Sequence, residues 1–270
     1  MIKKTFETLK KNPIILLWFA IPFVYTTVNT LLNRQGMLVG LSEMMNVPAE
    51  EWYTILPKIL ISMGIALVYQ ALWTFLLYPA ISRYIYWTVD EKPRENWFAR
   101  SLKGYWWRYF VLLLIYMAAA MAISVPFIII MVIVVIATNT AGGMFIGYGA
   151  MIFIIMLVGI FFYIGTAAAY AEDKFNTAVG NLFRAGAKYF FRAVPIFLLM
   201  LIPTMVTLIA MAIYEVQTIP DIFIILSSAW GSIFLAFISV YFMHCYMDYK
   251  KSKEKMDITQ AQEMDSMLTN

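Results

Sequence analysis

The lysine and arginine residues of this chain are confined to short stretches that alternate with long apolar runs. Eighteen of the twenty basic residues fall in four such stretches, and only Arg34 and Lys58 fall elsewhere. Because cytoplasmic loops of membrane proteins are enriched in Lys and Arg, this distribution predicts that all four stretches lie on one side of a membrane. They contain, in chain order, Lys3, Lys4, Lys10 and Lys11; Arg83, Lys92, Arg94, Arg100, Lys103 and Arg108; Lys174, Arg184, Lys188 and Arg192; and Lys250, Lys251, Lys253 and Lys255.

Six apolar stretches reach the roughly 20 residues that a helix needs to cross a bilayer. The first runs past Pro22 without a small-residue cleavage pattern, so it is expected to be a retained span rather than a signal peptide. We predict an all-α transmembrane domain over 1–249, a polar cytoplasmic tail over 250–270 that is mobile or helical only on binding, and cytoplasmic termini. The six spans are predicted at about 13–32, 59–81, 110–137, 145–170, 194–214 and 222–247.

Composition excludes a soluble domain, because 62% of the residues are hydrophobic and only 13% are charged. The net charge of +4 is assigned to anionic lipid head groups rather than to nucleic acid, since the basic residues flank membrane-length runs. Cys245 is the single cysteine, which excludes an intrachain disulfide. No catalytic motif is found, and with one His and one Cys no metal or other cofactor is expected. The adjacent carboxylates Glu172 and Asp173 are interpreted as the start of a solvated loop.

An internal repeat relates the second and third basic stretches. One set of residues recurs at a constant offset of 84, and a similar apolar sequence occurs at 13–22 and 195–203. These matches predict three repeated helical hairpins, each preceded by a basic lead-in and arranged in parallel about an axis near the membrane normal. The recurring residues are Arg100, Tyr105, Trp106, Trp107 and Arg108, matched by Arg184, Tyr189, Phe190, Phe191 and Arg192.

The lead-ins at 97–110 and 174–190 have the apolar spacing of amphipathic helices that lie in the membrane interface on the cytoplasmic side. Their basic residues either anchor the chain and fix its topology, or bind a specific lipid head group or a membrane or cytoplasmic protein partner. The residues assigned to lipid or partner contact are Arg100, Lys103, Arg108, Arg184, Lys188 and Arg192.

No Asp, Glu, Lys or Arg lies in the middle of a predicted span, which disfavours a proton-driven antiporter. Pro22, Pro126 and Pro203 interrupt the first, third and fifth spans and are expected to kink them. These kinks either serve helix packing or surround a central cavity, and both interpretations stay open.

Two segments of the chain, 77–114 and 168–200, resemble a known membrane family. In each, a short charged turn follows a span, and an amphipathic segment leads into the next span. The pattern is similar to six-helix bacterial families grouped around YciC-like proteins and the membrane domain fused to some glycerophosphodiester phosphodiesterases. The resemblance implies a six-span inner-membrane fold that assists transport or envelope functions. It carries over no catalytic residues, so the phosphodiesterase activity is not expected here.

These observations predict a non-enzymatic inner-membrane protein that supports a transport or envelope process through partners or lipids. The alternative is a small transporter or lipid translocase in which the kinked spans 1, 3 and 5 line a path. An intramembrane enzyme ranks third, and immunity to a membrane-active peptide is compatible with the same features.

Overall fold

The fold is entirely helical in the part of the chain that the computed structural model describes, which is residues 1–32, 52–92, 97–138, 154, 158–213 and 221–268. This confirms the all-α prediction for these residues. The helices are α1 (Ile2–Lys11), α2 (Ile14–Leu32), α5 (Trp52–Leu72), the π-helical turn η1 (Trp73–Leu77), α6 (Tyr78–Val89), α7 (Trp97–Leu102), α8 (Arg108–Thr138), an unlabelled helix Val158–Ala171, α10 (Phe175–Ile213) and α11 (Asp221–Leu268).

Among the described residues, three helical segments are long and apolar enough to cross a membrane: Met63–Val89, Arg108–Pro126 and Asp221–Gln262. Helices α1 and α2 meet at an angle of 90°. Counted together as one broken span, they give a fourth segment of sufficient length. The helix Val158–Ala171 is apolar but shorter. The predicted span 145–170 is described mainly from residue 158 onward. Most of the residues between predicted spans at 138–144 and 215–221 also lie outside the described part of the chain.

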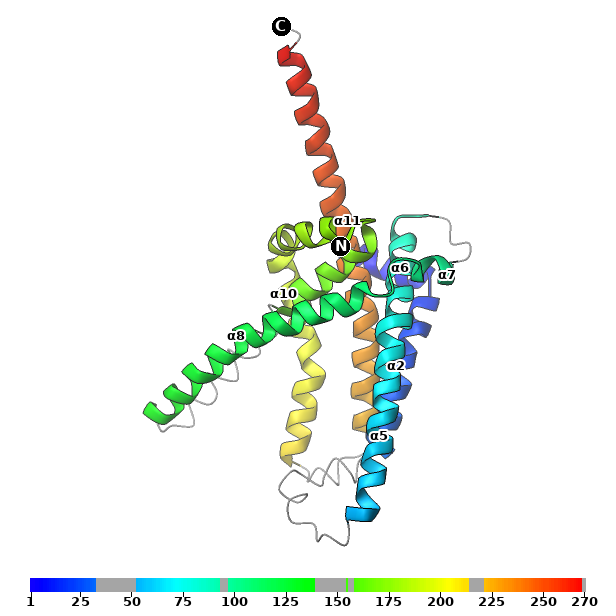
Figure 1. Cartoon of the computed structure of the whole chain (residues 1–270), viewed down its shortest axis with the longest axis vertical. Helices are drawn as coiled ribbons and strands as arrows, with labels where there is room; N and C mark the ends of the chain where they lie inside the picture. The colour runs from blue at the N-terminus through cyan, green and yellow to red at the C-terminus, as the bar shows by residue number, and fades with distance from the viewer. Residues whose placement is uncertain (33–51, 93–96, 139–153, 155–157, 214–220, 269–270) are drawn as a thin grey trace.

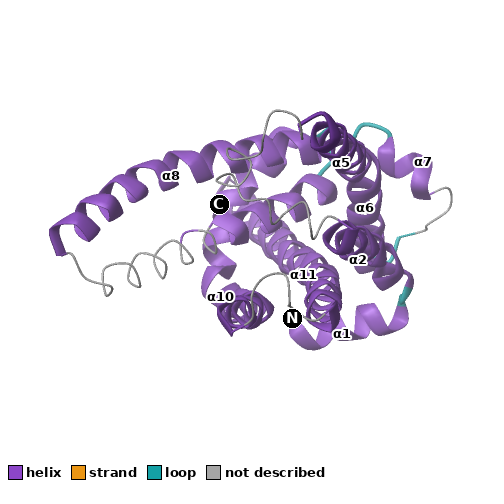
Figure 2. Ribbon diagram, turned by 90° about the horizontal axis from the view of Figure 1, so that it is seen from below, coloured by secondary structure: helices purple, strands orange, loops and turns teal. Residues whose placement is uncertain are grey.

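The helices are arranged around α11, which packs along α2 and also contacts α10, α1 and α6. Figure 1 shows that the N-terminus, α6, α7 and the point where α11 leaves the bundle all lie at one end of the molecule. Figure 2 shows α8 slanting away from the other helices. The end that holds the N-terminus is called the basic end below, because it carries the lead-in residues.

The bend between α1 and α2 falls at Asn12 and Pro13. Proline lacks a backbone N–H and is well tolerated at the start of a helix, so a new helix begins after it. On α1, Thr5 and Leu9 face the bundle, whereas Ile2 and Phe6 are exposed. This helix therefore lies across the basic end with an apolar edge directed outward.

The predicted amphipathic helix over 97–110 is interrupted. Helix α7 ends at Leu102, residues 103–107 form turns, and α8 begins at Arg108. The cause is Gly104, whose φ of 81° lies in the left-handed region that favours glycine and ends a right-handed helix. The second lead-in has no such break and forms one continuous helix with the residues that follow it, α10.

The C-terminal segment also differs from the prediction, because α11 is helical through residues 250–268. Figure 1 shows this extension projecting beyond the other helices. Its sequence contains no Gly or Pro and is rich in Lys, Met, Glu and Gln, all good helix formers. Local propensity and continuity with a packed span therefore favour the helix here.

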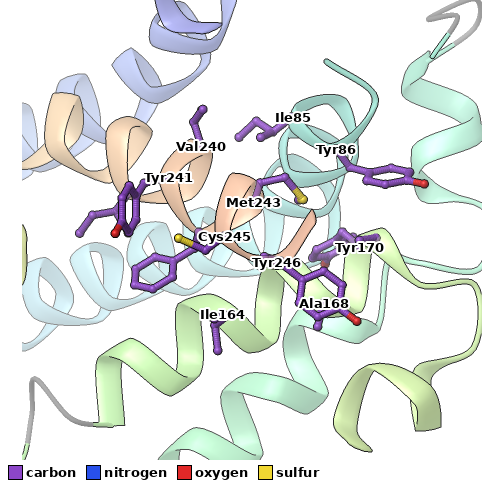
Figure 3. Close-up of a cluster of buried hydrophobic side chains, with 14 of the residues drawn as sticks. Ile85, Tyr86, Ile164, Ala168, Tyr170, Val240, Tyr241, Met243, Cys245 and Tyr246 are labelled. Carbon is purple, nitrogen blue, oxygen red and sulfur yellow. The ribbon is translucent and has the colours of Figure 1, made fainter. Parts of the chain in front are cut away.

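The core lies at the basic end, where side chains from most of the described helices are buried together. Figure 3 shows buried side chains of α6, of Val158–Ala171 and of α11 gathered in one cluster. Close approach depends on Gly186 of α10, because a Cβ there would lie 2.4 Å from a ring carbon of Phe161. The labelled members of the cluster are Ile85, Tyr86, Ile164, Ala168, Tyr170, Val240, Tyr241, Met243, Cys245 and Tyr246.

Candidate functional site

Two arginines cover the end of the helix Val158–Ala171. Arg83 of α6 is 9% exposed and Arg108 of α8 is 5% exposed. The guanidinium of Arg83 donates to the carbonyl of Tyr170. Arg108 donates to the carbonyls of Ala169 at 2.5 Å, Glu172 at 2.7 Å and Asp173 at 2.5 Å. The last carbonyls of a helix lack hydrogen-bond donors within it and carry partial negative charge. The two arginines supply both the donors and a compensating positive charge.

The ring of Tyr105 contacts both of these like charges. The guanidinium carbon of Arg83 lies 4.2 Å from the ring centroid and that of Arg108 lies 4.0 Å from it. Both distances are typical of cation–π contacts. Burial raises the pKa of Tyr105, which keeps the hydroxyl protonated as a donor to Asp173 Oδ1 at 3.2 Å. We call Arg83, Arg108 and Tyr105 the arginine cap.

Glu172 belongs to a second network that joins this helix end to α10 and α11. Its carboxylate accepts a hydrogen bond from Tyr246 at 2.9 Å and lies 3.4 Å from Lys250 Nζ. Asn181 of α10 is buried and donates to the same tyrosine oxygen at 3.1 Å. The interpretation of the Glu172 and Asp173 pair as a solvated loop start therefore fits Asp173, which is 94% exposed, better than Glu172.

The second lead-in repeats part of this arrangement 84 residues later. Tyr189 donates to Asp248 Oδ2 at 2.5 Å, as Tyr105 does to Asp173. The guanidinium carbon of Arg192 lies 5.8 Å from the Tyr189 ring. Arg192 is exposed, however, whereas Arg108 is buried.

Four more of the residues assigned to lipid or partner contact resemble Arg192 in their exposure to solvent. Arg100, Lys103, Arg184 and Lys188 are all exposed. Arg100 and Lys188 lie near aromatic rings, the first 5.8 Å from Trp87 and the second 5.5 Å from Tyr189. Arg108 stands apart from this group because its guanidinium is used inside the protein.

Large aromatic side chains are exposed beside these charges. Phe183 is 67% exposed next to Arg184, and Phe191 is 84% exposed next to Arg192. The opposite face of the same helix buries Leu182, Ala185 and Tyr189 against the bundle. The lead-in of α10 therefore has one buried face and one exposed face that carries both cations and aromatic rings. We use the term lead-in surface for this exposed face together with the exposed residues of the first lead-in, Arg100, Lys103 and Trp106.

The three prolines expected to kink their spans lie inside α2, α8 and α10, and each helix continues past its proline. These are Pro22, Pro126 and Pro203. The 90° bend that separates α1 from α2 lies instead at Asn12 and Pro13. An unexpected feature is the π-helical turn η1, which precedes Pro79. A wider turn relieves the clash between a proline ring and the preceding turn of the helix, which accounts for its position.

Among the described residues there is no group of three or more His, Cys, Asp and Glu side chains that could hold a metal ion. His244 Nε2 lies 2.9 Å from the Thr8 hydroxyl of α1, so it joins the two ends of the chain.

The role of Arg83 is not predicted from the sequence, whose apolar pattern places this residue in a connection beyond a span that ends at residue 81. In the structure α6 continues to Val89, and its residues 78–88 are all buried. A signal for this was present, because no Gly or Pro separates Arg83 from the aromatic run that follows it.

Comparison of the chain with protein-family models, curated proteins and solved structures found no match.

Proposed function

We propose that this chain is a non-enzymatic, multi-pass protein of a bacterial inner membrane that engages anionic lipid head groups at its basic end. In this proposal it supports a transport or envelope process through those lipids or through a protein partner bound there. The proposal includes six spans, built as three related hairpins, with both termini in the cytoplasm. The resemblance to the YciC-like and phosphodiesterase-associated membrane families is part of the same proposal.

The topology is supported by the common placement of the basic segments. The N-terminus, the two lead-ins and the exit of α11 gather at one end of the molecule (Figure 1). Positively charged loops are retained on the cytoplasmic side, so a shared end for these segments fits cytoplasmic termini.

The observation that carries the functional proposal is the lead-in surface. Exposed Phe183 and Phe191 flank exposed Arg184 and Lys188 along α10. Exposure of two phenylalanine rings to water is unfavourable, whereas the membrane interface accommodates both aromatic rings and cations. Each basic side chain near an anionic bilayer surface adds about 1 kcal/mol of attraction.

The test exchanges these charges in the full-length protein. We expect the double variant Arg184→Gln/Lys188→Gln, purified in mild detergent, to retain about thirtyfold less phosphatidylglycerol than the wild type, because two contributions of about 1 kcal/mol are lost. Lys253→Gln/Lys255→Gln is the matched control, since it removes the same charge from the extension of α11. Equal lipid retention by the two double variants would contradict the proposal.

A lipid translocase is the second candidate, and one groove favours it. Between α2 and α5 lies an apolar groove of about 480 Å³, lined by residues that include Tyr25, Gly64 and Tyr69. Its chemistry suits an acyl chain rather than a polar solute. A Cβ at Gly64 would meet no atom within 4 Å, so Gly64→Leu is expected to fill the groove without a clash. Proteoliposomes that scramble a fluorescent phospholipid with the wild type and less with this variant would favour the translocase.

A further inference from the structure

A polar cavity of about 340 Å³ lies between α1 and the inner part of α11, with the end of α6 as its third wall. Residues 4, 7, 8 and 11 of α1 face it, as do residues 244, 247, 248 and 251 of α11. Both sets have the spacing of one helical face. The contact between Thr8 and His244 joins the two faces at one point. Arg184 and Lys188 do not line this cavity, so it is distinct from the lead-in surface.

The depth of the cavity follows from α1. This helix turns by 90° from α2 and exposes Ile2 and Phe6, which is the arrangement of a helix lying in the membrane interface. A cavity between such a helix and a membrane-crossing helix lies at the level of lipid head groups.

The charged side chains that line the cavity carry both signs. Lys4 and Lys11 of α1 and Lys251 of α11 supply three cations, and within the described residues none of them forms an ion pair. Three carboxylates line the same space, namely Glu7, Glu91 and Asp248. Because carboxylates lie beside the lysines, a purely anionic ligand gains less from the cavity than a ligand that also carries a cation. A ligand that carries both a phosphate and a cation can use both sets.

The cation of such a ligand is further restricted by the absence of aromatic rings. Neither Phe, Tyr nor Trp occurs among the described residues that line the cavity. A quaternary ammonium is recognised by aromatic faces, because it has no N–H to donate. A primary ammonium instead donates up to three hydrogen bonds, which carboxylates such as Glu7 and Asp248 accept.

We infer that this cavity binds a phospholipid head group that carries a phosphate and a primary ammonium, as in phosphatidylethanolamine. The phosphate lies among Lys4, Lys11 and Lys251, and the ammonium lies toward the carboxylates. The inference rests on the proposed function as a lipid-engaging membrane protein, and it names a second lipid class and a second site for that function.

The test measures lipid binding to the full-length protein in detergent by native mass spectrometry. Phosphatidylethanolamine and phosphatidylcholine with identical acyl chains are compared, so that only the head group differs. We expect the wild type to prefer the ethanolamine lipid by about tenfold, and Lys4→Gln/Lys251→Gln to lose about tenfold in affinity for it, as expected when charge-assisted hydrogen bonds are removed. Glu7→Gln is expected to reduce the preference while leaving phosphatidic acid, which has no ammonium, bound as well or better.

Lys255→Gln serves as the control for the lysine variants, because it lies one turn beyond Lys251 outside the cavity. Equal binding of the two lipids by the wild type, or an unchanged affinity of Lys4→Gln/Lys251→Gln for the ethanolamine lipid, overturns the inference. Displacement of the lipid by free phosphoethanolamine at equal concentration overturns the assignment to a membrane lipid. Arg184→Gln/Lys188→Gln separates the two sites, since it is expected to lower phosphatidylglycerol retention and leave the ethanolamine preference intact.

Discussion

The two lead-ins share a sequence pattern and a tyrosine–aspartate contact, yet their arginines have opposite surroundings. Arg108 is buried against three carbonyls, whereas Arg192 is exposed. The difference lies in the helix that each one meets. The helix Val158–Ala171 ends beside Arg108 and offers carbonyls that need donors. Helix α11 continues past Asp248 to Leu268, so its carbonyls there are paired within the helix. A repeated motif therefore becomes a helix cap only where its partner helix ends.

The largest expected effect comes from removing the buried arginine that distinguishes the first lead-in from the second. Arg108→Met should lower the free energy of unfolding by about 2–4 kcal/mol, because it removes charge-assisted hydrogen bonds and leaves buried carbonyls without donors. Arg192→Met is the matched variant and should change it by less than about 0.5 kcal/mol, as for most exposed sites. Thermal unfolding in detergent, followed by tryptophan fluorescence, measures both. Similar losses in the two variants would show that the cap is not what distinguishes the lead-ins.

The second prediction concerns the break that only the first lead-in has. Gly104 corresponds to Lys188 at the offset of 84, and only Gly104 adopts a positive φ. Gly104→Ala should destabilise the protein by about 1 kcal/mol, because a side chain in the left-handed region is strained even though the surrounding space is open. Gly180→Ala is the control, since this helical glycine also has open space around it and Ala favours a helix. The same unfolding assay should place the two variants on opposite sides of the wild type, and a neutral Gly104→Ala would contradict the argument.

The comparison also shows what the sequence could and could not predict. Apolar length predicts membrane-crossing helices such as α8, and the offset of 84 predicts that Tyr105 and Tyr189 occupy similar places. The burial of Arg83 and Arg108 depends on where a helix some 60 to 90 residues away ends in space. Neither hydropathy nor local propensity contains that information. The cavity between α1 and α11 is a similar case, because its lysines come from opposite ends of the chain.

The smallest expected effect sharpens the tyrosine contacts. The bond from Tyr189 to Asp248 is partly buried, whereas the bond from Tyr105 to Asp173 is exposed. Tyr189→Phe should therefore lower the free energy of unfolding by about 1 kcal/mol, the net value of one hydrogen bond, and Tyr105→Phe by less. Burial and the bond to Asp248 raise the pKa of Tyr189. The folded protein thus favours the protonated phenol, and this stability is present below the unfolded pKa of about 10 and is lost as the pH rises through the folded value.

The pH dependence gives this last prediction a readout that side-chain size cannot imitate. Between about pH 9 and 11 the wild type should lose more stability than Tyr189→Phe, because only the wild type carries this phenol. Since Tyr105→Phe retains Tyr189, it should follow the wild type more closely over the same range. Parallel pH curves for all three proteins would mean that the Tyr189 hydroxyl is not held by Asp248. The two lead-ins would then share a sequence repeat without sharing the contact that makes them structurally alike.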